Sequence, residues 1–152
     1  MTVRRSIDLP CPVGEAWAVL TRWERQADWM LDADEVIVRS AHREGVGVRL
    51  DVRTRLFHVP AFVEPMEIVG WDPPRSLTIA HGGAVRGRGT WTLEPDEAGT
   101  RFTWTEDVEL AIPAVGALAA AIYAPVMRAL MGRAQRGLRE LIIASGPARD
   151  VA

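Results

Sequence analysis

The sequence has 152 residues, of which 48% are hydrophobic and 25% are charged, and its formal net charge is -2. This length suits one domain, residues 1–152, with a sizeable core, and the composition is that of an ordinary soluble protein. The slight negative charge gives no reason to expect nucleic acid as a partner. The single cysteine, Cys11, excludes an internal disulfide and a cysteine metal cluster. No charged and then apolar leader precedes the first expected strand, so we expect a cytoplasmic protein.

The first thirty residues predict one strand followed by two short helices. Residues Thr2–Leu9 alternate apolar and polar side chains, as strands do, and Pro10-Cys11-Pro12 ends this segment. Between two prolines, the cysteine is interpreted as a small turn residue, with a catalytic thiol as the alternative. Val13–Arg22 has helical spacing, and Glu24–Met30 predicts a second short helical piece. We expect these two helices to form a compact aromatic elbow from Trp17, Trp23 and Trp29.

Six further strands are predicted after the helices, because the hydrophobic period changes to two. The clearest is Val46–Leu56, where valine, leucine and threonine alternate with arginine and aspartate. This alternation predicts an antiparallel sheet with one face on a core and the other in water. In Pro60–Trp71, Pro65 indicates a bulge or an edge. The remaining strands are expected at Glu35–Ala41, Ser76–His81, Val85–Glu94 and Gly99–Leu110.

A long C-terminal helix is predicted over Pro113–Ser145, because a proline at its start and Gly146-Pro147 after its end are typical helix boundaries. Pro125 removes a backbone donor, so we expect a kink or break there, with Pro113–Ala124 as a separate first section. Ala114–Met127 is almost wholly apolar but too short to span a bilayer, and we expect it to be buried in the protein. The apolar stripe is predicted to comprise Leu118, Ile122, Val126, Leu130, Ala134, Leu138 and Leu141, flanked by Tyr123, Met127 and Met131 and opposite Arg128, Gln135, Arg136 and Arg139.

The predicted order of one strand, two short helices, six strands and a long helix indicates an α+β fold. Consecutive strands with short turns form an antiparallel meander, and only the helices can cover its apolar face. We therefore expect a curved antiparallel sheet of about seven strands wrapped around the long C-terminal helix. The space between sheet and helix is the candidate binding site.

Several phrases of the sequence resemble the START-like, or SRPBCC, helix-grip superfamily, in particular its bacterial polyketide cyclase/dehydrase-like branch. They are residues 7–29 (IDLPCPVGEAWAVLTRWERQADW), 45–47 (GVG), 71–75 (WDPPR), and 93–95 (LEP) running into 99–104 (GTRFTW). The superfamily also includes START lipid-binding domains and plant pollen-allergen-type carriers. The resemblance covers essentially the whole chain, and it implies a helix-grip fold with a ligand bound between sheet and helix. The resemblance does not indicate one particular function, because relatives range from enzymes to passive carriers.

Three side chains are candidates for acid and base chemistry: Glu106, His81 and Tyr123. On the last strand, Glu106 shares its parity with Trp104, so an inward apolar face would carry a carboxylate. It is a candidate general acid or base, with a salt bridge at the cavity mouth as the alternative. His81 shares its parity with Ile79, which would bring an imidazole to the rim of the pocket. Tyr123 is the only tyrosine, and its hydroxyl is available to a ligand or to Glu106.

The apolar walls of the binding space are expected to come from the strands, the elbow and the long helix. Gly87 and Gly89 share the inward parity of Trp91 and would leave a void above the sheet, although glycine can equally mark a bend. The candidate ligand-binding residues are Trp29, Phe62, Met66, Trp91, Trp104, Met127 and Leu130.

The sequence predicts neither a cofactor nor a metal site. Residues 82–89 are glycine-rich, but they lack the strand-to-helix context and the lysine of a phosphate loop. The three histidines are far apart in the chain and belong to no local metal motif. His42 and His58 lie near strand ends, where we expect them to be exposed to solvent.

Three functions are weighed. The preferred one is binding of a small hydrophobic, aromatic or polyketide-like molecule by a monomer or homodimer without integral membrane association. The second is a polyketide cyclase/dehydrase, whose cavity would hold a poly-β-ketone for aldol cyclisation and loss of water. The third is a protein-interaction or quinone-carrier accessory module docking through its outer sheet face. That face would carry Arg49, Arg53, Arg55, Arg86, Arg88 and Arg101, with a merely solvated surface as the alternative.

Overall fold

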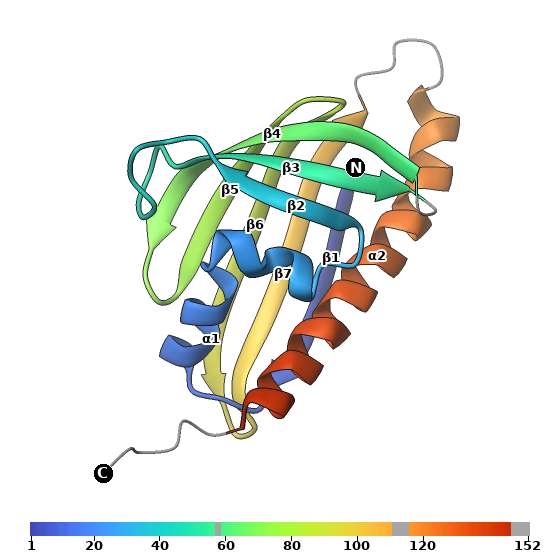
Figure 1. Ribbon diagram of the computed structural model, residues 1–152. Coiled ribbons are helices and arrows are strands. Elements are labelled where there is room, and N and C mark those ends of the chain that lie inside the picture. Colours follow the sequence, from blue (N-terminus) through green and yellow to red (C-terminus); the bar gives the residue numbers. More distant parts are fainter. Residues whose placement is uncertain (57–58, 111–115, 147–152) are drawn as a thin grey trace.

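The computed structural model describes residues 1–56, 59–110 and 116–146 of the chain, and in these it shows one antiparallel sheet and three helices (Figure 1). The strands lie in the order β1-β7-β6-β5-β4-β3-β2, so each pairs with its neighbour in the chain except β1, which pairs with β7. The elements are β1 (Thr2–Leu9), α1 (Val13–Leu20), η1 (Trp23–Asp28), β2 (Ala33–Val38), β3 (Arg49–Leu56), β4 (Val59–Asp72), β5 (Ser76–Gly82), β6 (Val85–Asp96), β7 (Gly99–Leu110) and α2 (Gly116–Ser145).

The sheet curves, and its concave side faces the helices (Figure 1). The long helix α2 packs mainly on the edge strand β1, η1 packs on the opposite edge strand β2, and α1 lies against β6 and β7. This arrangement confirms the predicted α+β helix-grip fold with seven strands. The predicted bounds of β1 and β7 agree with the structure residue for residue.

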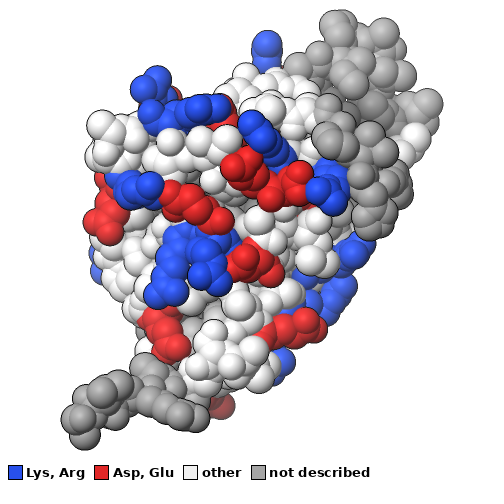
Figure 2. Space-filling view, viewed as in Figure 1, with Lys and Arg blue, Asp and Glu red and all other residues white. Residues whose placement is uncertain are grey.

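The two faces of the sheet follow the predicted alternation. In β3, for example, Leu50 is buried, whereas Arg53 is exposed and pairs with Glu35 at 2.9 Å. Arg101 on β7 likewise pairs with Asp8 of β1 at 3.1 Å. Basic and acidic side chains are interspersed on the face shown in Figure 2. Arg53 and Arg101 are thus paired within the sheet, and docking of a partner on the outer face stays a prediction.

Pro65 lies within β4 without a bulge of its own. Its pairing with Asp51 of β3 is regular, and the register shift between β4 and β5 occurs later, between Ile68 and Gly70. The pairing of β4 with β5 begins at Met66, so Pro65 stands at the end of that ladder. An interior strand can accept a proline there, because no ladder hydrogen bond requires its missing N–H.

The prediction that Pro125 separates two helical sections was wrong. α2 runs unbroken from Gly116 to Ser145 with Pro125 inside it, while the predicted start at Pro113 lies outside the described residues. Pro125 and Ala121, four residues before it, are both exposed. Water can therefore satisfy the carbonyl that the proline leaves without a helical partner. The predicted end at Ser145 is confirmed, and Gly146 follows with a positive φ of 66°.

The predicted buried face of α2 is confirmed only in part: Ala134 and Leu138 of the predicted stripe are buried, whereas two members nearer its N-terminus are exposed. Ile122 is 63% exposed and Val126 is 47% exposed, so the expected burial of this apolar stretch is incomplete. Gln135, expected on the solvent side, is buried and donates a hydrogen bond from Nε2 to the carbonyl of Arg5 at 3.1 Å. The buried positions that α2 presents to the sheet are Met131, Ala134, Gln135, Leu138 and Ile142. None of the described helices has the length and apolarity to cross a membrane.

The tryptophans form two clusters rather than the single predicted elbow. Trp17 and Trp23 meet Trp71 of β4, with ring centroids 4.9 and 6.3 Å apart. Trp29, which was expected to join them, instead packs on Trp91 at 5.9 Å.

Candidate ligand-binding site

Two of the predicted catalytic residues, His81 on β5 and Glu106 on β7, meet on the concave face of the sheet. His81 Nε2 lies 3.1 Å from Glu106 Oε2, and Trp104 Nε1 donates to Glu106 Oε1 at 2.5 Å. Glu106 is 4% exposed, and the side chain of His81 is 11% exposed. When Glu106 is ionised it accepts both bonds, so the proton of neutral His81 stands on Nε2. His81 Nδ1 is buried and has no partner among the described residues.

The space above Gly89, which was predicted to belong to a void, is filled. A Cβ on Gly89 would lie 2.6 Å from Glu106 Oε1, so the carboxylate occupies that space. Gly87 has a φ of 134°, and its Cβ would lie 2.2 Å from the carbonyl oxygen of Asp107 on the next strand. Gly89 therefore makes room for the carboxylate of Glu106, and Gly87 lies in close contact with the backbone of β7.

Glu64 on β4 is a second buried carboxyl of the concave face, and the sequence analysis missed it. It is 3% exposed, its Oε1 accepts the backbone N–H of Gly83 at 3.0 Å, and its Oε2 has no partner among the described residues. A Cβ on Gly83 would lie 2.6 Å from Oε2. The sequence could have indicated its position, because Glu64 alternates in step with Met66 and Ile68 and so lies on the inward face of the strand.

Tyr123, the third predicted catalytic residue, is half-buried on α2. Burial raises the pKa of its phenol to about 12, and the negative charges of Glu106, Glu64 and Asp32 contribute to that rise, in this order. The tyrosine therefore lies within the field of both concave-face carboxyls, and it stays a protonated hydrogen-bond donor at neutral pH. Burial also raises the pKa of Asp32, while Arg133 opposes that rise.

The predicted wall residues divide into a packed group and a group nearer the surface. Trp29, Trp91 and Trp104 are buried, and Trp91 packs on Trp104 at 5.7 Å and on Phe102 at 6.0 Å. The indole N–H groups of Trp29 and Trp91 have no partner among the described residues. Of the others, Phe62 is 39% exposed, and Met66, Met127 and Leu130 are half-buried.

The remaining predicted chemistry is absent from this site. Cys11 is 5% exposed, and burial raises the pKa of its thiol to about 11, so the thiol stays protonated and unreactive at neutral pH. His42 is exposed, as expected, and His58 lies outside the described residues. Within the described ranges no cluster of histidine, cysteine or carboxylate residues could hold a metal ion.

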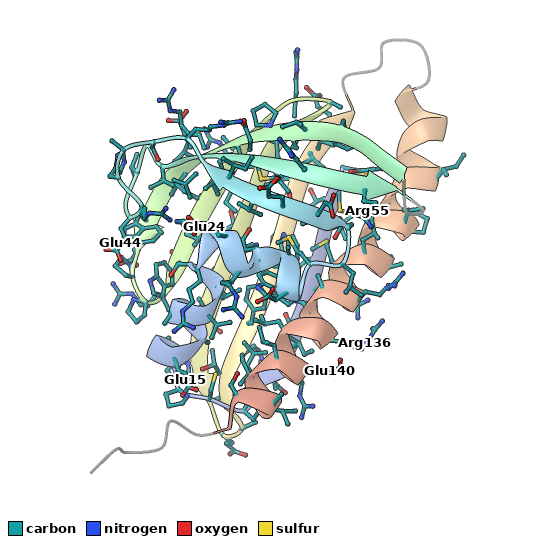
Figure 3. All side chains as sticks on the ribbon, in the orientation of Figure 1. Glu15, Glu24, Glu44, Arg55, Arg136 and Glu140 are labelled. Atoms are coloured by element: carbon teal, nitrogen blue, oxygen red, sulfur yellow. The ribbon has the colours of Figure 1, made fainter. Side chains whose placement is uncertain are left out.

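An open groove of about 420 Å³ lies elsewhere, between η1 and α2. Arg136 and Glu140, labelled in Figure 3, belong to the stretch of α2 that forms one side of it. The sequence analysis did not predict this groove, because its two sides are about one hundred residues apart in the chain. It is lined by Asp28, Leu31, Arg133, Arg136, Glu140 and Leu141, among others.

Comparison with known proteins agrees with this architecture. The family described as polyketide cyclase/dehydrase and lipid transport matches residues 1–142. The structure of TTHA0849 from Thermus thermophilus is similar with a TM-score of 0.79 and 23% identity, over 97% of this chain and 100% of that one. The structure of a conserved protein from Geobacillus kaustophilus is similar with a TM-score of 0.73 and 18% identity, over 95% of this chain and 97% of that one.

A third similar structure is the di-domain ARO/CYC protein StfQ from the steffimycin biosynthetic pathway. The TM-score is 0.77 at 14% identity, and the match covers 95% of this chain but only 51% of StfQ. No curated protein sequence matches the chain. At these identities the likenesses to solved structures establish the fold alone.

Proposed function

The chain belongs to the polyketide cyclase/dehydrase and lipid transport family, and we propose that it binds a small hydrophobic, aromatic or polyketide-like molecule between the sheet and α2. The observation that carries this proposal is the buried polar group formed by His81, Glu106 and Glu64 beside an aromatic core. Buried polar atoms are normally paired, and each unpaired one costs stability. Their presence on the face where the family resemblance places the ligand supports a binding role.

In this proposal the apolar and polar side chains of the site have different roles. Trp104, Met66 and Met127 contact the apolar body of the ligand, and methionine side chains adapt to its shape. His81 and Tyr123 orient its polar groups, the first through Nδ1 and the second through its protonated phenol. Binding of this kind needs no cofactor. The cytoplasmic location and the monomeric or homodimeric state stay predictions.

Native mass spectrometry of the protein purified from its own host tests the proposal. We expect a mass above that of the chain, and extraction should release an aromatic, polyketide or isoprenoid compound. A clean apo mass that stays unchanged after exposure to a panel of such compounds would contradict it.

The second candidate function is catalysis of polyketide cyclisation, and the pair of His81 and Glu106 favours it. Because both Glu106 oxygens already accept N–H groups, Glu106 positions the imidazole and His81 moves the proton. His81 Nδ1 takes a proton from a methylene between two carbonyls, and the carbanion attacks a third carbonyl to form the new C–C bond. The resulting alkoxide takes that proton back, and loss of water follows. The phenol of Tyr123 donates a hydrogen bond to the carbonyl that gains charge.

Turnover of a poly-β-ketone by matched variants tests this second function. His81→Ala is expected to lower kcat by roughly 10²-fold or more, because general-base catalysis contributes about that much. Glu106→Gln is expected to lower kcat less, since the introduced amide still accepts one hydrogen bond but carries no charge to stabilise the imidazolium. Turnover at the wild-type rate in both variants would show that these roles are wrong.

A further inference from the structure

We propose that Glu64 is the specificity-determining residue of the concave site, and that its unpaired Oε2 accepts a hydrogen bond from a hydroxyl of an aromatic ligand. This inference rests on the proposed binding function and narrows the ligand class to hydroxylated aromatic molecules, such as phenols and naphthols. It also predicts that the corresponding ethers, which lack the donor, bind more weakly.

Comparison with Glu106 shows why Glu64 requires an external partner. Both carboxyls are almost completely buried, and a glycine on the neighbouring strand or turn makes room for each. The protein supplies donors to both oxygens of Glu106, from Trp104 and His81. Among the described residues it supplies a donor to only one oxygen of Glu64, from Gly83. A buried acceptor without a donor carries its full desolvation penalty, which a ligand hydroxyl would remove.

The strand register places Glu64 next to the other candidate binding groups. Glu64 pairs with the buried Val52 of β3, so its side chain lies on the inner face. Two residues further along β4, Met66 pairs with His81. Glu64 and His81 are thus diagonal neighbours on one face, which brings long side chains within reach of the same small molecule.

The chemistry of the surrounding groups agrees with a hydroxyl ligand. His81 Nδ1 is a second unpaired acceptor on this face when Glu106 is ionised, and Tyr123 is a protonated donor under the influence of both carboxyls. A phenolic hydroxyl can donate to one acceptor while its oxygen accepts from a donor, and its ring can pack on the tryptophans. Glu64 confers the preference for a hydroxyl compound over its ether, because a hydrogen bond from a hydroxyl to a carboxylate is stronger than one to a neutral acceptor.

The test compares the dissociation constants of hydroxyl and methyl-ether pairs of aromatic compounds with one to four rings, such as 2-naphthol and 2-methoxynaphthalene. Wild-type protein, Glu64→Gln and Glu67→Gln are titrated by calorimetry. The Glu64→Gln side chain keeps an oxygen for the Gly83 N–H but presents an amide NH₂ where Oε2 was. Glu67 is the matched control, because it lies on the same strand but is exposed.

We expect the wild-type protein and Glu67→Gln to bind the hydroxyl compound about tenfold more tightly than its ether, because the ether leaves Oε2 unpaired. In Glu64→Gln the preference should fall below about twofold, with the ether affinity nearly unchanged. Equal wild-type affinity for both members of every pair would overturn the role of Glu64 and leave the binding function standing. Wild-type binding of no pair at all would overturn both. Should Glu64→Gln fail to fold, the wild-type comparison alone still decides.

Discussion

The concave face of the sheet has two regions, one of packed aromatic rings and one of buried polar side chains. In the aromatic region, Trp29, Trp91 and Phe102 pack ring against ring with centroids about 6 Å apart and little or no exposed surface. In the polar region, Glu64 and His81 each keep a buried atom without a partner among the described residues. Trp104 joins the two, because its ring packs on Trp91 while its N–H bonds Glu106.

The difference separates a region that stabilises the fold from one that is proposed to bind a ligand. Tightly packed aromatic rings contribute stability through the apolar area they bury and through edge-to-face contacts. Buried carboxyls and an imidazole with unpaired atoms contribute little or cost stability. A protein keeps such groups where function requires them, and changes in the two regions should therefore have different consequences.

The largest expected effect comes from truncating the aromatic region. Trp91→Ala should lower the free energy of unfolding by about 3–5 kcal/mol, because it removes a fully buried ring that contacts three others. Glu64→Leu in the polar region should change it by less than about 1 kcal/mol, since it replaces an incompletely paired carboxyl with an apolar group of similar size. Urea unfolding followed by tryptophan fluorescence measures both. Equal losses in the two variants would abolish the distinction between the regions.

An intermediate effect is expected where a glycine makes room for a carboxylate. Gly89→Ala would place a methyl group 2.6 Å from Glu106 Oε1, so we expect a loss of about 1–3 kcal/mol and a displaced Glu106. The ¹⁵N chemical shifts of the His81 imidazole should move, because its carboxylate partner moves.

The matched control for this substitution is Gly14→Ala, on an exposed position of α1 with nothing within 4 Å of the added methyl group. It should be neutral or stabilise the protein by up to about 1 kcal/mol, since alanine favours helix. Unchanged imidazole shifts and stability in Gly89→Ala would argue against a rigid Glu106 at this position.

The smallest expected effect is a loss of stability at alkaline pH. Folding raises the pKa of Cys11 from 9.0 to about 11 in the core and that of Tyr123 from 10.0 to about 12 beside the polar region. The folded state therefore holds both protons more tightly, so this stability is complete below pH 9 and declines as the pH rises toward 12. Between about pH 8 and 10 we expect a fall of about 1–2 kcal/mol.

Two variants separate the contributions of Cys11 and Tyr123 to this decline. Cys11→Ala should flatten the part that begins near pH 9, and Tyr123→Phe the part that begins near pH 10. Urea midpoints at half-unit pH intervals provide the measurement. A wild-type slope that persists in the double variant would assign the alkaline loss to other groups.

The fold could be predicted from the sequence because the patterns that indicate its strands and helices involve only residues close together in the chain. The alternation in Val46–Leu56 depends on adjacent residues, and the boundaries of β1 and β7 stand beside prolines and glycines that end strands. The order of the elements then leaves few arrangements for a meander and one long helix. His81 and Glu106 could be chosen for the same reason, since each shares its strand's inward parity.

The errors concern contacts between residues distant in the chain. Almost every position of α2 near Ile122 is apolar, so hydropathy alone could not decide which of them faces the sheet. The space above Gly89 belongs to Glu106, which lies on another strand, and a glycine in the sequence carries no sign of its occupant. Trp29 belongs to the second cluster through its contact with Trp91 of β6, which is far from it in the chain.

The sequence by itself thus determined the strands, the helices and their order, because these follow from the local periodicity of apolar residues and from proline and glycine at their ends. Only the tertiary structure decided which donors reach Glu106 and which oxygen of Glu64 has none among the described residues, because hydrogen-bond partners are set by the register of neighbouring strands. The same register and the packing of α2 also place Tyr123 where the negative charges of both carboxyls raise the pKa of its phenol.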